Sequence, residues 1–155
     1  MELNKPLGYI LGQSLRVFRN QLAFEFKDKG IELSFDQFAM LHILNSDCDC
    51  IQQDLANQLQ KDKSIIVRQI NSLLENQYVV RLINKDDKRK KNLILTKKGF
   101  EILNQMKEIA SELSTKLLTG VSENELETFR NVLMKIQENG GAEEEFFNCG
   151  QDQLK

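Results

Sequence analysis

The sequence predicts a mainly α-helical protein that carries one small β-hairpin. Apolar residues recur at three- and four-residue steps through most of the 155-residue chain, a spacing typical of amphipathic helices. The chain has a single proline, so few positions forbid long helices. Two short extended runs, 79–83 and 93–95, flank a polar loop and predict a hairpin. The expected order is four helices, two strands and two further helices.

The starts and stops of the first three helices follow from local side chains. The first helix is expected over residues 5–29, where leucines and phenylalanines form one apolar face, and Gly30 is a suitable left-handed stop. The stretch Ser34 to Gln37 has the capping-box pattern, so it predicts the start of a second helix. Asp49 to Gln52 repeats the pattern and predicts the start of a short third helix.

The remaining helices have similar start signals. Asp62 is a suitable N-cap for a fourth helix ending near residues 76–77. One face of that helix should be buried through Ile66, Ile70, Leu73 and Leu74. Thr96 is expected to cap a fifth helix that runs to about Leu118, and the stretch Ser122 to Glu125 is expected to open a sixth. We find no linker that would divide the chain, so residues 1–155 are expected to form a single domain.

Charge is unevenly distributed along the chain. The formal net charge is −2, yet Arg81 to Lys98 holds eight cations against two carboxylates. The final stretch from Gly120 to Lys155 holds eight acids against three bases. A basic segment on an acidic body indicates an anionic partner that binds at one place. The alternative is a charged loop that is simply solvated.

Several classes of protein are disfavoured by what the sequence lacks. No apolar run approaches the roughly 20 residues of a membrane span, and no signal-peptide pattern is present, so we expect a cytoplasmic protein. No catalytic motif is visible, so we expect no enzyme activity and no cofactor. The pair Cys48 and Cys50 lacks zinc-site spacing, so no metal is expected either. With Cys149, the cysteines are odd in number and indicate free thiols in a reducing compartment.

The centre of the chain, residues 33–98, has the order of a winged helix-turn-helix. Two helices, a short turn and a further helix are followed at once by a cationic hairpin. A helix of ordinary diameter fits the major groove of duplex DNA and presents polar side chains to base edges. A cationic hairpin beside it can follow the phosphates and place an arginine in the minor groove. The position of the cationic cluster is therefore explained by a polyanionic partner, duplex DNA.

At these residues the sequence resembles the MarR family of winged-helix regulators. The family's wing pattern is Asp-x-Arg, an apolar residue, and then Leu-Thr-x-x-Gly. The matching positions here are Asp87-Lys88-Arg89, Leu93 and Leu95-Thr96-Lys97-Lys98-Gly99. Upstream, the run from Leu33 to Phe38 looks like the family's second-helix opening, and Asp62 to Arg81 is similar to its recognition helix and exit. The resemblance extends over about residues 7–136.

The resemblance implies a role for individual residues. The helix from Asp62 to Asn76 would be the recognition helix, Arg89 would enter the minor groove, and Asp87 would orient the wing through an ion pair with a nearby arginine. Arg81, at the start of the hairpin, could be that partner. The implied DNA-binding residues are Lys63, Ser64, Val67, Arg68, Asn71, Lys88, Arg89, Lys90 and Lys91. Two positions depart from the family: Val67 replaces a common threonine or serine, and Gln77 replaces a glycine.

Family members are homodimers, and the helices outside the winged part independently favour a dimer. The expected dimerisation helices cover residues 5–30 and 99–139, followed by an acidic tail over 140–155. Their apolar faces are longer than a small winged core can cover. The alternative is that the first, fifth and sixth helices pack on one another within one chain. A two-fold dimer predicts a near-palindromic operator in double-stranded DNA.

The expected function is a homodimeric DNA-binding transcriptional regulator, a repressor that a small ligand releases from DNA. The family precedent is an aromatic or phenolic effector, with Phe18, Phe35, Phe38 and His42 as candidate pocket walls; these residues could equally be plain core, or a hydrogen-bonded helix residue in the case of His42. Two alternatives stay open. The first is a winged-helix module that docks an acidic protein. The second is a redox-sensing regulator, since Cys50 lies beside an expected helix N-terminus, which favours a thiolate.

Overall fold

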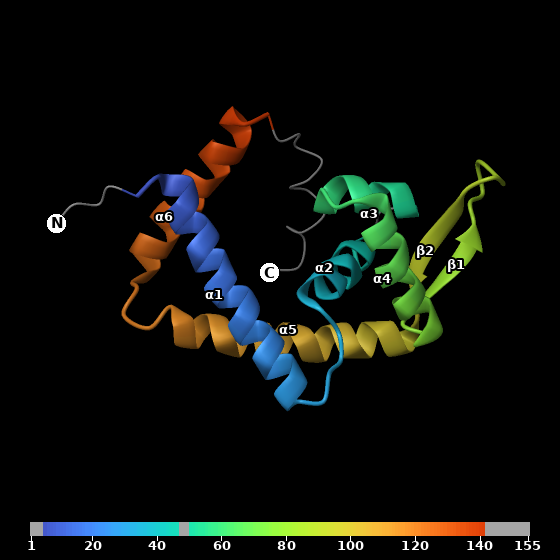
Figure 1. Cartoon of the computed structure of the whole chain (residues 1–155), viewed down its shortest axis with the longest axis horizontal. Helices are drawn as coiled ribbons and strands as arrows, with labels where there is room; N and C mark the ends of the chain where they lie inside the picture. Colours follow the sequence, from blue (N-terminus) through green and yellow to red (C-terminus); the bar gives the residue numbers. More distant parts are fainter. Residues whose placement is uncertain (1–4, 47–49, 142–155) are drawn as a thin grey trace.

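The computed structural model describes residues 5–46 and 50–141, and its element order is the one expected from the sequence (Figure 1). The described chain is mainly helical with one antiparallel hairpin. The helices before the hairpin are α1 Leu7–Asp28, α2 Phe35–Leu44, α3 Gln52–Leu59 and α4 Lys63–Glu75. The hairpin strands are β1 Val79–Ile83 and β2 Lys91–Leu95, followed by α5 Lys97–Leu117 and α6 Glu123–Asn139.

The first helix is buried only toward its C-terminal end. Leu22 and Phe26 are buried where α1 packs on α5, whereas Leu7 and Leu15 are 59% and 51% exposed. The predicted apolar face of α1 is therefore covered over its second half alone. The helix ends at Asp28 with Lys29 as its C-cap, and Gly30 directly after the cap has a φ of +75°, the left-handed geometry expected there.

The predicted capping box of α2 is confirmed, and it reaches further than the local pattern suggests. Ser34 Oγ accepts from the Gln37 backbone N–H at 3.1 Å, and Gln37 Oε1 accepts from the Ser34 N–H at 3.0 Å. The Gln37 amide is buried and also donates to the backbone carbonyl of Gln69 on α4 at 3.3 Å. One glutamine side chain therefore caps α2 and ties it to α4.

The predicted start of α3 is wrong. The helix begins at Gln52 with Ile51 as its N-cap, and the Ile51 N–H donates to Asp54 Oδ2 at 2.8 Å. Asp49, the predicted cap, lies outside the described residues. The cause of the later start is tertiary, because Ile51 is extended and bridges Asn92 of β2. Extended backbone at the sheet edge prevents the helix from beginning earlier.

The fourth helix has the predicted buried face. Ile66, Ile70 and Leu73 are each 1% exposed or less, and Leu74 is partly buried. Asp62 occupies the N-cap position, although its side chain makes no capping hydrogen bond within the described residues. Past the end of the helix, Gln77 has a φ of +61°. The structure thus keeps the left-handed exit with a residue that lacks glycine's freedom.

The last two helices start at the predicted caps. Thr96 Oγ1 accepts from the Gly99 N–H at 3.0 Å, and Ser122 with Glu125 forms a capping box. In Figure 1, α5 runs along the lower part of the molecule, from the hairpin to the turn that leads into α6, and the C-terminal part of α1 crosses it. Leu103, Met106 and Leu113 of α5 are buried and belong to the hydrophobic core.

The sixth helix stands apart from the core. Taken within the described part of the chain, none of its residues is buried. Phe129 and Val132 are 49% and 46% exposed, and Met134 and Ile136 are 40% exposed. Intramolecular packing therefore leaves most of the apolar face of α6 uncovered, with Leu126 and Leu133 half-buried. No helix among the described residues is long and apolar enough to span a bilayer.

Candidate nucleic-acid interface

The face of α4 opposite its buried side is polar and open. Lys63, Ser64, Arg68 and Asn71 are all exposed, and Val67 is half-buried between them. The buried side is fixed by the apolar positions of the helix, so the 3.6-residue period places these four side chains outward together. An exposed helix face with two cations, a hydroxyl and an amide has the donors and acceptors that read base edges.

The hairpin beside α4 is short and in simple register. Val79 pairs with Leu95 and Ile83 pairs with Lys91, and β1 packs against α4 while β2 packs against α3. Leu93 is buried beneath the sheet, which anchors the hairpin to the helices. The cationic residues 88–91 therefore lie at the outer end of a hairpin whose base is fixed (Figure 1).

Asn84 organises the turn at the end of the hairpin. Its Oδ1 accepts from the backbone N–H groups of Asp86 and Asp87 at 2.8 and 3.0 Å. Its Nδ2 donates to Oδ1 of Asn92 at 2.9 Å, and its backbone N–H donates to the Lys90 carbonyl. Sequence reasoning missed this residue. The available signal was an asparagine directly after a strand, which is a common start of a side-chain-stabilised turn.

Asp87 and Arg89 form an ion pair at the hairpin tip. Oδ1 of Asp87 accepts from the Arg89 backbone N–H at 3.0 Å and lies 3.2 Å from Arg89 Nε. The backbone hydrogen bond and then the side-chain hydrogen bond from Arg89 lower the pKa of the Asp87 carboxyl. Arg89 nevertheless keeps its side chain 92% exposed. The pair sets the direction of the arginine and leaves its guanidinium accessible.

The suggested pairing of Arg81 with Asp87 is not found. Arg81 donates from Nη2 to Oε1 of Gln52 at 3.3 Å, and Asp87 pairs with Arg89 instead. The register explains the difference, since Arg81 lies opposite Leu93, within the hairpin and away from its tip. Arg81 therefore links the hairpin to the start of α3.

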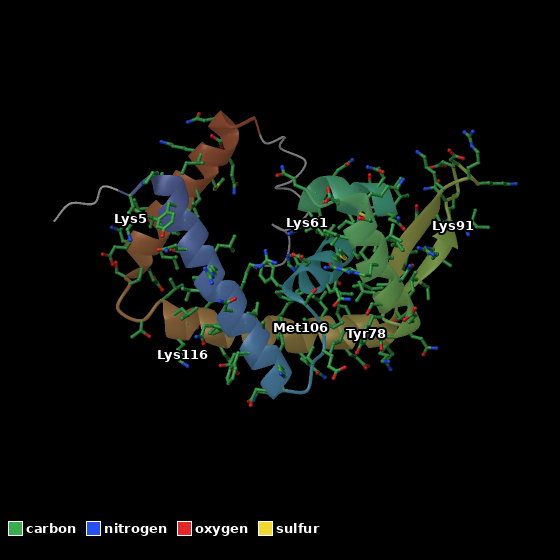
Figure 2. All side chains as sticks on the ribbon, viewed as in Figure 1. Lys5, Lys61, Tyr78, Lys91, Met106 and Lys116 are labelled. Atoms are coloured by element: carbon green, nitrogen blue, oxygen red, sulfur yellow. The ribbon has the colours of Figure 1, made fainter. Side chains whose placement is uncertain are left out.

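An open groove of about 430 Å³ lies between the hairpin, α3 and the start of α4. Its uncharged lining residues are Ile51, Gln52, Gln53 and Leu93. Its cations are Lys63, Arg81, Arg89, Lys90 and Lys91. In Figure 2, Lys91 is seen on the hairpin, on the side of α4 opposite Lys61. The groove shows that the first residue of α4 and the hairpin tip share one cationic surface.

The four candidate effector residues have other contacts in the structure. Phe35 and Phe38 pack against the core, and the Phe38 ring meets Phe26 edge-on with centroids 5.6 Å apart. His42 lies on α2, and the residue as a whole is exposed. Partial desolvation of its imidazole is the larger cause of a lowered pKa, and repulsion from Lys107 is the smaller one. Phe18 is half-buried on α1. None of the four lines the cationic groove.

Of the three cysteines that a redox sensor could use, the structure describes Cys50. Cys50 is 2% exposed and belongs to the core. Cys48 and Cys149 lie outside the described residues. A buried thiol is poorly accessible to oxidants, which lowers the weight of Cys50 as a sensor. Among residues 5–46 and 50–141, no cluster of three or more histidine, cysteine or acidic side chains is placed to hold a metal ion.

Comparison with known proteins agrees with this geometry. Residues 33–91 match the family model described as MarR family. The transcriptional regulator PA3341 has a similar structure, with a TM-score of 0.77, 26% identity, and coverage of 89% of this chain and 100% of that one. A MarR transcriptional regulator from Methanosarcina mazei Go1 gives a TM-score of 0.76 and 26% identity, covering 86% and 95%. The transcriptional regulator SlyA has a TM-score of 0.76 and 22% identity, and the match covers 92% of this chain and 99% of SlyA.

The family match includes α2, α3, α4, β1 and the cationic tip of the hairpin. The structural matches extend the likeness to the flanking helices, because they cover most of both chains. Residues 33–91 are therefore similar to the MarR family, and the described chain has the winged-helix fold of the MarR transcriptional regulators that it resembles.

Proposed function

We propose that this protein is a homodimeric transcriptional regulator that binds a near-palindromic site in double-stranded DNA. The winged part, residues 33–98, provides the DNA-binding surface, and residues 5–30 and 99–139 provide the dimer contacts. In this proposal the protein acts by binding DNA and not by catalysis. Its chromosomal target places it in the cytoplasm. Repression relieved by a small aromatic or phenolic ligand completes the proposal.

The observation that carries the proposal is the cationic surface shared by α4 and the hairpin. Lys63 at the start of α4 and residues 89–91 at the hairpin tip line one groove, beside the exposed Ser64 and Arg68. A helix that reads bases in a DNA groove needs polar side-chain ends that are not buried in the protein core. Contacts to the neighbouring phosphates need lysine and arginine side chains next to that helix. Both requirements are met on one side of the molecule.

The dimer is supported by the uncovered apolar surface of the flanking helices. On α1, Leu7, Leu15 and Phe24 are 51–66% exposed, and α6 exposes Phe129 and Ile136. Scattered exposed apolar residues are ordinary, but a helix that buries no residue and leaves most of its apolar face open indicates an interaction surface. A second copy of the chain would cover both helices and place two recognition helices roughly one DNA turn apart.

The test is a titration of purified protein against duplexes obtained by binding-site selection. We expect selection of an inverted repeat and an affinity that falls steeply as salt rises. Arg68→Ala should lose roughly 1–3 kcal/mol and relax base preference, whereas Arg89→Ala should weaken binding and lower the salt dependence. Lys116→Ala is a matched control, since Lys116 lies at the end of α5 far from the hairpin (Figure 2). Weak binding that is independent of base sequence would refute the proposal in favour of a protein-docking module.

A further inference from the structure

A carboxylate at the start of α2 lies between two cations from different elements. Oδ1 of Asp36 is 3.2 Å from Nη2 of Arg19 on α1, and Oδ2 is 3.8 Å from Nζ of Lys61. The Asp36 side chain is 15% exposed, while the two cations are 38% and 36% exposed. The Arg19 guanidinium also lies 4.8 Å from the centre of the Phe35 ring. We name these three charged residues the Asp36 bridge.

The Asp36 bridge joins a helix proposed to form the dimer to the start of the helix proposed to read DNA. Arg19 belongs to α1, one of the helices proposed to contact a second copy. Lys61 directly precedes Asp62, the N-cap of the recognition helix α4. In the view of Figure 2, Lys61 and Lys91 lie on opposite sides of α4, so Lys61 is remote from the hairpin. The Asp36 bridge therefore connects the dimer side of the molecule to the beginning of α4 without forming part of the cationic groove.

We propose that Asp36 is a positioning residue that sets the distance between the two recognition helices of the dimer, an inference that depends on the proposed function. If α1 is fixed by the second copy, any tilt of the winged part moves the start of α4 relative to its symmetry mate. The Asp36 bridge opposes that tilt because it holds the turn before α4 to α1. The protein should consequently prefer one spacing between DNA half-sites.

The bridge is not needed to hold α4 in the fold. Ile66, Ile70 and Leu73 are buried in the core, and Gln37 hydrogen-bonds to the α4 backbone independently of Asp36. Partly exposed ion pairs contribute little to stability. Removing the Asp36 bridge should therefore widen the range of accessible tilts and leave the folded state largely intact.

The experiment compares affinities for duplexes that differ only in half-site spacing. The selected inverted repeat and versions with one or two base pairs added or removed between its halves are titrated with wild type and Asp36→Asn. Wild type should discriminate against altered spacing, and Asp36→Asn should reduce that discrimination by roughly two- to fivefold, the range for partly exposed ion pairs. Thermal unfolding of both proteins shows whether stability has changed.

Matched variants separate the Asp36 bridge from a general effect of charge. Arg19→Gln and Lys61→Gln each keep the carboxylate at the α2 start, and each should reduce spacing discrimination in part. Glu32→Gln, before α2, removes the same negative charge as Asp36→Asn from an exposed side chain that makes no ion pair within the described residues, and it should have no effect. Arg19→Gln should cause no further change in an Asp36→Asn background.

The outcomes distinguish this inference from the proposed function. If wild type selects no inverted repeat, the proposed function fails and the positioning role fails with it. If wild type binds specifically while Asp36→Asn, Arg19→Gln and Lys61→Gln all keep its spacing preference, the positioning role alone is refuted. If Asp36→Asn proves unstable, the two cation variants decide the question, because each keeps the carboxylate in the first turn of α2.

Discussion

Gly99 lies against the backbone carbonyl of Tyr78 so closely that a Cβ at position 99 would be 2.0 Å from the carbonyl oxygen. This contact joins the start of α5 to the exit of α4, and it gives a physical reason for a glycine three residues after Thr96. The Thr96 hydroxyl strengthens the same junction, since it donates to the Gln77 carbonyl at 2.6 Å while it caps α5.

Gly99→Ala should destabilise the protein by about 1–3 kcal/mol, because a backbone carbonyl cannot move aside as a flexible side chain can. Gly12→Ala on α1 is the control, since a Cβ there has no neighbour within 4 Å among the described atoms and alanine favours helix. Chemical denaturation measures both. Equal stabilities for the two variants would contradict the close contact.

Gln77→Gly should stabilise the protein by about 1 kcal/mol. The φ of +61° at this position is costly for a residue with a Cβ and costs glycine nothing. The melting temperature should rise by roughly 2–4 °C for a chain of this size. Gln105→Gly, in the interior of α5, makes the same chemical change where φ is helical, and it should destabilise by about as much. A fall in stability for Gln77→Gly would show that the left-handed geometry is not the native one.

The ion pair at the hairpin tip should depend on pH in the acid range. The folded-state pKa of Asp87 is lowered, so its contribution is present above the unfolded value of about 3.9 and is lost as pH falls through the folded value. The Asp87 carboxyl, followed by carbon-detected NMR, should therefore titrate with a midpoint below about pH 3.9. Arg89→Ala should move the midpoint upward, but only in part, because the backbone N–H at position 89 remains a donor. An unchanged midpoint would exclude a side-chain contribution from Arg89.

Phe129→Asp on α6 should weaken the proposed dimer at least about tenfold, because it places a charge in a large apolar surface. Helix content of the monomer should be retained, since Phe129 is half exposed in the single chain. Asn131→Asp adds the same charge two residues further along, on another face of the helix, and should leave association unchanged. Sedimentation at several concentrations distinguishes the variants. A monomeric wild type would refute the dimer outright.

The elements that sequence reasoning located correctly are those whose causes are local. The caps at Ser34, Thr96 and Ser122 each join a side chain to a backbone group three residues away, so a short window contains both partners. The buried face of α4 follows in the same way from the helical period. Together with the two extended runs that predict the hairpin, these signals were sufficient for the order of the eight described elements.

The details that were missed depend on partners distant in sequence. Arg81 bonds to Gln52, 29 residues away, and Asp36 lies between α1 and the turn before α4. The late start of α3 has the same origin, because the bridge from Ile51 to Asn92 forms only in the folded chain. Residue types alone do not determine which of several cations a carboxylate will meet in space.

The openness of α6 has a consequence for how the protein behaves at low copy number. A helix that buries no residue in its own chain gains little folding free energy until something covers it. If that cover is a second copy, then dilution loosens the C-terminal helix, and the melting temperature rises with the amount of protein present. Abundance would then govern not only how many operators are filled but also how well folded each molecule is.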